Sequence, residues 1–237
     1  IADIIDDAFV EADETVIVTL SNPTNAVLGS DVSSIVGAEL AFAAIKEDGS
    51  VVTWGYADYG GNSSSVASSL TSGVSSIVSN GSAFAALKED GSVVTWGYGS
   101  KSSDYSNQGG DSSTVASSLT SGVSSIVSNG NAFAALKTDG SVVTWGGADY
   151  GGNSSGVASS LSSGVSSIVG NSLAFAAIKT DGSVVTWGYA DRGGDSSSVA
   201  SSLTSGVSSI VSSNIAFAAI KTDGSVVTWG YADRGGD

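Results

Sequence analysis

A phrase of short apolar and polar segments recurs five times along the chain. In its third copy, 123–127 (Val-Ser-Ser-Ile-Val) alternates loosely and is rich in β-branched residues, and 132–136 (Ala-Phe-Ala-Ala-Leu) is apolar. The next residues, 137–140, carry Asp-Gly, a hairpin-turn signal because glycine accepts positive φ, and 141–145 returns as a second apolar segment. These segments are short and bounded by Gly, Ser, Asn or Asp, which is typical of strands. No window has a 3.6-residue apolar period long enough for a helix.

The phrase returns with a period typical of propeller blades. It closes on Val-Val-Thr-Trp-Gly in every copy, with the tryptophan at Trp54, Trp96, Trp145, Trp187 and Trp229. Neighbouring copies lie 42 residues apart, except that a seven-residue insertion after Tyr98 stretches one spacing to 49. A final piece, such as Val-Ala-Ser-Ser-Leu at 157–161, leads into the next copy and is a candidate fourth strand. Three or four short strands per copy predict a blade or a solenoid coil.

Segment 79–97 carries the most specific signal: Ser-Asn-Gly-Ser-Ala-Phe-Ala-Ala-Leu-Lys-Glu-Asp-Gly-Ser-Val-Val-Thr-Trp-Gly. This phrase resembles the repeat of the regulator-of-chromosome-condensation family, and all five copies match it over about 31–237. The resemblance implies an all-β fold, a β-propeller that in the family usually has seven four-stranded blades. The chain departs from that pattern in its five copies, its short units and its lack of His before the apolar strand. We therefore expect a β-propeller of five near-identical repeats over 30–237, arranged around an axis.

The first 29 residues have a different pattern. An acidic pair and Glu-x-x-Glu-Thr precede an alternating strand that runs into Leu-Ser-Asn-Pro. This resembles the last strands of a Calx-beta domain, so we assign 1–29 to a Calx-beta-like N-terminal β-hairpin or strand. The resemblance implies calcium binding by acidic residues, and the candidate ligands are Asp6, Asp7, Glu11, Asp13 and Glu14. We favour the alternative, a solvated acidic edge that discourages strand aggregation, and beyond this calcium candidate we expect no cofactor.

The amino-acid composition of the chain excludes several classes of function. The 237-residue chain has a formal net charge of −15, and a surface of that sign repels phosphate backbones, so we expect no nucleic-acid partner. It contains neither His nor Cys, which excludes His–Cys zinc sites, Ser-His-Asp triads, thiol nucleophiles and disulfides. We therefore predict that it is not an enzyme and that it has no catalytic residues. No apolar run is long enough to span a membrane, so we expect no membrane insertion.

Two aromatic sets recur once per copy and are best explained as core. Each tryptophan precedes glycine at one fixed place, as a repeated core or inter-blade contact requires. The phenylalanines lie among alanines in mid-strand, at Phe42, Phe84, Phe133, Phe175 and Phe217. The lysine before each Asp-Gly turn is interpreted as an exposed side chain paired with the adjacent aspartate.

The insertion at 99–109 is the one place where the repeat symmetry is broken. Unique loops on repetitive scaffolds are frequent binding sites, and Tyr105, Asn107 and Gln108 are the binding-loop candidates. Neutral variation in an exposed loop explains the insertion equally well. The residues after Trp-Gly are nearly uniform, which favours a scaffold over a tailored clamp: Tyr56, Tyr98, Gly147, Tyr189 and Tyr231.

These observations favour a structural, adhesive segment of a large exported bacterial protein, located at the cell surface or outside the cell. Its partner would then be itself or another surface protein. The absence of Cys fits export, and both ends of the sequence look cut from something longer. The alternative is a propeller-type protein-binding or inhibitor module that uses one face or the 99–109 loop. The exchange activity and chromatin binding of the resembled family are not carried over, because the chain lacks a basic surface.

A last expectation concerns closure. The chain has five copies of Val-Ser-Ser-Ile-Val but four of Val-Ala-Ser-Ser-Leu, so one blade should be short of a strand. The segments 15–20 or 25–28 could fill the gap in their own chain, which gives a closed ring. If they fill the gap of the next chain, strand donation produces a head-to-tail filament.

Overall fold

The computed structural model describes residues 31–99 and 108–236, which form five three-stranded antiparallel sheets. In every sheet the strands are neighbours in the order in which they follow along the chain. The strands are β1 (Val32–Gly37), β2 (Ala41–Lys46), β3 (Val51–Gly55), β4 (Val74–Ser79), β5 (Ala83–Lys88), β6 (Val93–Gly97), β7 (Val123–Ser128), β8 (Ala132–Lys137), β9 (Val142–Gly146), β10 (Val165–Gly170), β11 (Ala174–Lys179), β12 (Val184–Gly188), β13 (Val207–Ser212), β14 (Ala216–Lys221) and β15 (Val226–Gly230).

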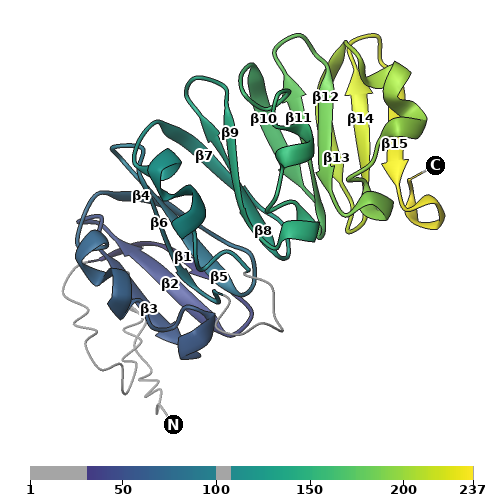
Figure 1. Cartoon of the computed structure of the whole chain (residues 1–237). Helices are drawn as coiled ribbons and strands as arrows, with labels where there is room; N and C mark the ends of the chain where they lie inside the picture. Colours follow the sequence, from purple (N-terminus) through teal and green to yellow (C-terminus); the bar gives the residue numbers. More distant parts are fainter. Residues whose placement is uncertain (1–30, 100–107, 237) are drawn as a thin grey trace, which may run out of the picture.

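Each sheet belongs to one sequence repeat, and Figure 1 shows the five sheets side by side in a curved row. We number the repeats as units 1 to 5. Their described residues are 31–73, 74–99 with 108–122, 123–164, 165–206 and 207–236. Unit 1 and unit 5 lie at opposite ends of the row (Figure 1). The all-β repeat architecture predicted from the sequence is confirmed.

The hairpin in each unit follows the local sequence signals. In unit 2, the Asp-Gly turn joins β5 to β6, and Gly91 adopts φ +76° while its N–H bonds the Lys88 carbonyl at 2.9 Å. The two strands place Phe84 opposite Trp96, and the rings stack with centroids 5.2 Å apart. The same aromatic pair occurs in all five units.

The predicted fourth strand is wrong, because the Val-Ala-Ser-Ser-Leu segments form 3₁₀ turns and helices. In unit 4, the Asp195 carboxylate accepts the Ser197 N–H at 2.8 Å, and the Val199 N–H bonds the Ser196 carbonyl at 3.1 Å. An Asx turn followed by i→i+3 bonds curls the chain, so the leucine Leu203 is buried while the serines face outward. The helices are η2 (Ser64–Ser69), η3 (Ser113–Leu119), η5 (Ser155–Val157) and η7 (Ser197–Leu203).

This correction also removes the basis of the closure expectation. The piece that unit 5 lacks corresponds to a helical cover and not to a strand, so the unit is not short of a strand. The proposed donor segments 15–20 and 25–28, the assigned 1–29 region and its boundary lie outside the described residues. They stay predictions.

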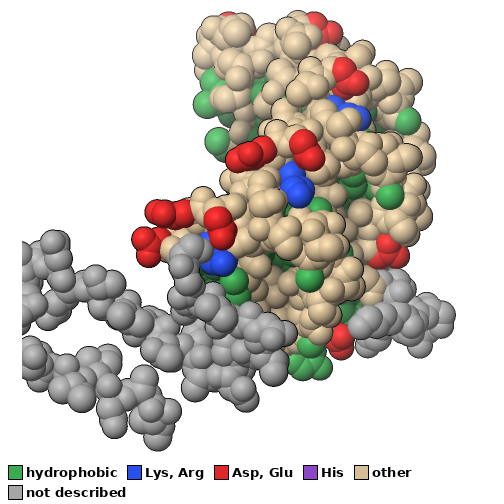
Figure 2. Space-filling view, turned by 90° about the vertical axis from the view of Figure 1, so that its left-hand side faces the viewer, with side chains coloured by type: hydrophobic (Ala, Val, Ile, Leu, Met, Phe, Trp, Pro, Cys, Tyr) green, Lys and Arg blue, Asp and Glu red, His purple; other side chains and the backbone are tan. Residues whose placement is uncertain are grey.

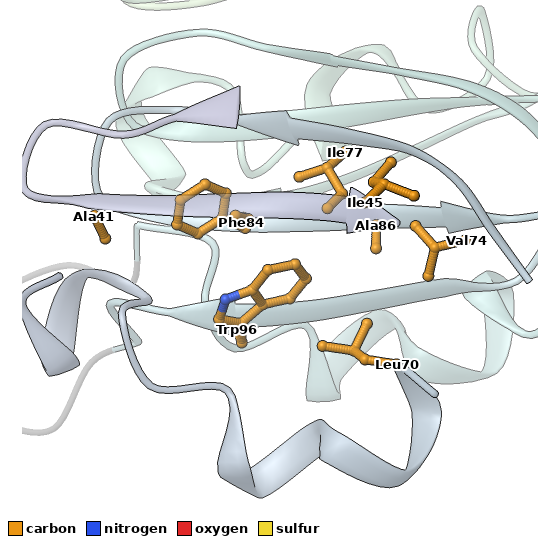
Figure 3. Packing of buried hydrophobic residues seen from close by; sticks show 9 residues of the cluster. Ala41, Ile45, Leu70, Val74, Ile77, Phe84, Ala86 and Trp96 are labelled. Atoms are coloured by element: carbon orange, nitrogen blue, oxygen red, sulfur yellow. The ribbon is translucent and has the colours of Figure 1, made fainter. Parts of the chain in front are cut away.

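The apolar core lies between units, where the face of one sheet packs on the next. Between units 1 and 2, unit 1 contributes Ala41, Ile45 and Leu70, and unit 2 contributes Phe84 and Trp96 at the centre (Figure 3). Alanine on one side leaves room for the large rings on the other, so the sheets approach closely. The tryptophans and phenylalanines of units 2 to 5 are buried, which confirms them as core residues.

Unit 1 departs from this rule. Phe42 is 45% exposed and Trp54 is half-buried, although the sequence predicts both as core. The physical reason is that these rings belong to the face that packs on a preceding unit, and no preceding unit lies within the described residues. No described helix is long and apolar enough to cross a membrane.

Candidate binding surface

In units 1 to 4, the turn that follows Trp-Gly is fixed against the next unit by a hydrogen bond and a close contact. The Trp96 indole N–H donates to the Gly60 carbonyl oxygen at 3.0 Å. Gly60 adopts φ +95°, and a Cβ on it would lie 2.5 Å from Cδ2 of Phe84. The same bond joins the later units, at 3.2 Å from Trp145, 3.1 Å from Trp187 and 3.1 Å from Trp229. These turns are therefore held rigidly along one edge of the row.

The turns contain four short 3₁₀ helices that carry tyrosine or arginine at their ends. They are η1 (Ala57–Tyr59), η4 (Ala148–Tyr150), η6 (Ala190–Arg192) and η8 (Ala232–Arg234). Each tyrosine or arginine lies three positions after the residue that follows Trp-Gly, so both side chains emerge from the same turn.

These side chains contact one another between units and form a row. Tyr59 lies against Tyr98 of the next unit, with ring centroids 5.8 Å apart, and Tyr150 against Tyr189 at 6.1 Å. The Arg192 guanidinium lies 4.3 Å from the ring centre of Tyr231, a cation–π contact. We name this row the tyrosine ridge, and its members are Tyr56, Tyr59, Tyr98, Tyr150, Tyr189, Arg192 and Tyr231.

The tyrosine ridge faces solvent and carries negative charge. Tyr56 is 58% exposed and Tyr189 is 41% exposed, although units 2 to 5 bury their phenylalanine and tryptophan rings between units. Exposed aspartates accompany the ridge in four of the turns, at Asp58, Asp149, Asp191 and Asp233. The sequence shows these tyrosines as a near-uniform set, but not that neighbouring units bring them into contact.

The ridge is interrupted between units 2 and 3, where the insertion lies. Gln108 occupies the position of Tyr59, and Gly147 occupies that of Tyr98, so no aromatic pair forms there. Gln108 is half-buried, and its main-chain carbonyl accepts the side-chain amide of Asn80. In unit 4, Asn171 holds the Arg192 carbonyl in the same way at 2.6 Å. The structure therefore fixes one end of the insertion, while the other loop candidates, Tyr105 and Asn107, lie outside the described residues.

The lysine row differs from its predicted pairing. Lys46 lies 3.8 Å from Asp48, but the lysines of the other units donate to a carbonyl at the end of the preceding unit's 3₁₀ segment. Lys179, for example, donates to the Ser160 carbonyl at 2.9 Å. The sequence could not reveal this partner, because it belongs to the neighbouring unit. Figure 2 shows Lys and Arg side chains beside Asp and Glu side chains on a face that is otherwise mostly polar and uncharged.

The aspartates of the hairpin turns have lowered pKa values. In unit 4, the Ser183 hydroxyl donates to the Asp181 carboxylate at 2.6 Å, and the Ser183 backbone N–H donates at 2.9 Å. These two bonds, the hydroxyl first, hold the pKa of Asp181 below its ordinary value of 3.8. The hairpin turns of the other units show the same shift.

The other candidate sites offer few groups that could bind a ligand or a metal ion. A hollow of about 380 Å³ on unit 4, bordered by Ser160 of unit 3, is lined by Lys179, Asp181 and the end of η7, and it opens to solvent. Within the described residues, no three acidic, His or Cys side chains gather as metal ligands. The calcium candidates Asp6, Asp7, Glu11, Asp13 and Glu14 all fall outside those residues.

Comparison with known proteins shows which solved structures have a similar fold. No protein-family model and no curated protein matches the chain. Three similar solved structures are human WBSCR16 (TM-score 0.52, 18% identity, 84% of this chain and 61% of that one), Prp20p from Saccharomyces cerevisiae (0.52, 16%, 85% and 57%) and yeast RCC1 (Prp20) bound to Kap60 (0.53, 16%, 85% and 56%). The chain spans less than two thirds of each of them. At this level of identity the likeness concerns the fold alone, which is the repeat β-propeller fold of RCC1-type proteins.

Proposed function

We propose that this chain is a non-catalytic protein-binding module whose tyrosine ridge docks a partner protein. The observation that carries the proposal is the row of solvent-facing aromatic side chains in mutual contact across units. Tyrosine and arginine are enriched at protein interfaces, where they provide large contact areas and hydrogen-bonding groups together. A repetitive scaffold without ligands to hold has no structural need for such a row.

The ridge is also suited to binding because it is rigid. The glycines after Tyr59, Tyr150 and Arg192 are held by the next unit's tryptophan, so these turns are ordered before a partner arrives. A preordered surface loses little conformational entropy on binding. Gly99 and Gln108, the described residues on either side of the insertion, belong to the turn that follows Trp96 and Gly97.

Charge indicates the class of partner. The net charge of −15 and the aspartates beside the ridge favour a basic protein and disfavour nucleic acid. Two of the similar structures are described by the proteins that they bind, namely Gsp1p and histones for Prp20p, and Kap60 for yeast RCC1. These descriptions support protein binding as the function of the fold, in preference to adhesion.

Other expectations remain proposals. Export to a bacterial surface, calcium binding and the Calx-beta-like segment rest on the sequence alone. The non-catalytic assignment is supported by the absence of His and Cys from the sequence.

Selection of binders on the intact protein tests the proposal. We would pan a phage-displayed random-peptide library on the immobilised 237-residue chain. The selected peptides are then titrated against a ridge variant with Tyr56→Ser, Tyr189→Ser and Tyr231→Ser. The matched control carries Ser76→Ala, Ser167→Ala and Ser209→Ala, which alter exposed side chains on the first strands of three units.

We expect basic peptides that bind the control as they bind the parent and that lose at least tenfold in affinity on the ridge variant. Melting temperatures of both variants should match the parent, since all six side chains are exposed. Peptides that bind the ridge variant and the parent equally would refute the ridge as the binding surface.

A further inference from the structure

The four interfaces between units are built in the same way, from two different faces. We call the side of a unit that packs on the following unit its trailing face, and the side that packs on the preceding unit its leading face. Between units 4 and 5, the trailing face contributes Ala176 and Ile178, with Val169 and Val184 at its margin. The leading face contributes Ile210, Phe217 and Trp229, among others.

The two ends of the row expose one half each. On the leading face of unit 1, Val32, Ile35 and Phe42 are exposed, with Ile35 at 58%. Within the described residues, the Trp54 indole N–H has no counterpart of the Gly60–Trp96 bond. The apolar side chains that units 2 to 5 bury at this face are therefore presented to solvent by unit 1.

The trailing face of unit 5 is the complementary half. Val211, Ile220 and Val226 occupy the positions of Val169, Ile178 and Val184, and all three are exposed, with Val226 at 60%. In unit 4 the equivalent surface is covered by unit 5, and Ile178 at its centre is 7% exposed.

Two glycines of unit 5 already have the backbone conformation that the equivalent glycines of unit 4 adopt at a covered interface. A Cβ on Gly182 would lie 2.7 Å from the Gly206 nitrogen, and one on Gly193 would lie 2.6 Å from Cδ2 of Phe217. Their unit 5 counterparts, Gly224 and Gly235, keep similar φ values of +84° and +91°. Nothing described lies within 4 Å of a Cβ on either, so these two close approaches are made in unit 4 and open in unit 5.

We propose that the trailing face of unit 5 docks on the leading face of unit 1 of a second copy of this chain, repeating the interface between units. The occupant is inferred from continuity, because the chain shows four times which surface covers each of these halves. Figure 1 places the two faces at opposite ends of the curved row, so they meet between copies and not within one. Two unlike faces give a head-to-tail contact, which leaves each copy one face free to take up a further copy.

This contact joins separate molecules, so it must offset the translational and rotational freedom lost on association, which the interfaces within the chain do not. We therefore expect reversible assembly that grows with concentration. The proposal is independent of the tyrosine ridge, which lies on the edge of the row and not on its ends.

Mixing two capped variants tests the proposal. The leading-face variant carries Val32→Lys and Ile35→Lys, and the trailing-face variant carries Val211→Lys and Val226→Lys. All four side chains are exposed, so both variants should fold. A control carries Ser76→Lys and Ser125→Lys, exposed positions on units 2 and 3, away from both ends. Each is examined by sedimentation velocity from micromolar to near-millimolar concentrations.

The parent and the control should form oligomers whose mass rises with concentration, and each capped variant alone should be monomeric. An equimolar mixture of the two variants should form a dimer and nothing larger, because one intact pair of faces remains. A parent that stays monomeric throughout would refute the proposal. So would a capped variant that still dimerises alone, since that result requires like faces to pair, or a mixture that stays monomeric.

Discussion

The indole nitrogen of Trp96 bonds the carbonyl oxygen of Gly60, 36 positions earlier in the chain, at 3.0 Å. The bond crosses from unit 2 to unit 1 and lies in the apolar interface, where an unpaired carbonyl would be costly. Because each unit contacts only its neighbours in the row, the stability of the molecule is close to a sum over such interfaces.

Replacing an interface tryptophan should therefore destabilise the chain. Trp187→Phe removes the donor to the Gly151 carbonyl and leaves a smaller ring in a buried site, so we expect a loss of about 1–3 kcal/mol in unfolding free energy. Trp54→Phe is the matched control, since its ring is half-buried and it should cost much less. Urea unfolding followed by far-ultraviolet circular dichroism measures both. Equal losses would contradict this role of the indole.

Two equivalent glycines, Gly193 and Gly235, allow the effect of close packing on stability to be measured apart from that of backbone strain. Gly193→Ala and Gly235→Ala both place alanine at positive φ, at +96° and +91°. The first also drives a methyl group into Phe217, whereas the second meets nothing described. We expect Gly193→Ala to be the more destabilising by more than 1 kcal/mol, because the packed ring must shift. Melting temperatures of the two variants that agree within error would show that packing adds nothing.

The sequence predicts most of the repeated core and hairpins, because these features depend on local patterns. The Asp-Gly turns, the Phe–Trp pairs and the burial of both rings in units 2 to 5 follow from strand alternation and turn chemistry. The valine and leucine of the fourth segment favour a strand, and that prediction is wrong. The decisive signal is the Asn or Asp two residues before the helix, as in the Asx turn from Asp195 to Ser197.

The candidate surface depends on contacts that no single repeat contains. Tyr59 and Tyr98 belong to different units, as do Lys179 and the Ser160 carbonyl, so their contacts follow only from how the units stack. The exposure of Phe42 has the same origin, because the phenylalanine position is core only when a preceding unit covers it.

Asn171 should be needed to hold the turn that carries Arg192. Its side-chain amide donates to the Arg192 carbonyl at 2.6 Å, and its oxygen accepts the N–H groups of Leu173 and Ala174 at 2.8 Å. Asn171→Ala leaves these groups unpaired in a buried site and should cost about 2 kcal/mol in thermal unfolding. Ser213→Ala, at the exposed equivalent position in unit 5, should cost clearly less. The reverse order would contradict the assignment.

The hairpin aspartates should make stability fall in acid. Since the folded pKa of Asp181 is lowered, folding favours the ionised carboxylate. The contribution is present above the ordinary pKa of 3.8 and is lost as pH falls through the lowered value. Ser183→Ala removes the hydroxyl, which is the main cause, and should raise the pKa of Asp181 in a carboxyl ¹³C NMR titration. Asp223, beside an intact Ser225, serves as the internal control and should not change. An unchanged Asp181 would contradict the cause given.

Hydrogen exchange of the five tryptophan indole N–H groups tests the central claim most directly, that the units are joined in a row and that the leading face of unit 1 is open. We would record ¹H–¹⁵N spectra of the leading-face variant, which keeps the chain monomeric. The account predicts slow exchange for Trp96, Trp145, Trp187 and Trp229, which bond glycine carbonyls of the preceding unit, and fast exchange for Trp54. Fast exchange of all five would contradict the interfaces between units. Slow exchange of Trp54 would show that its face is covered within the chain, which would contradict the open row.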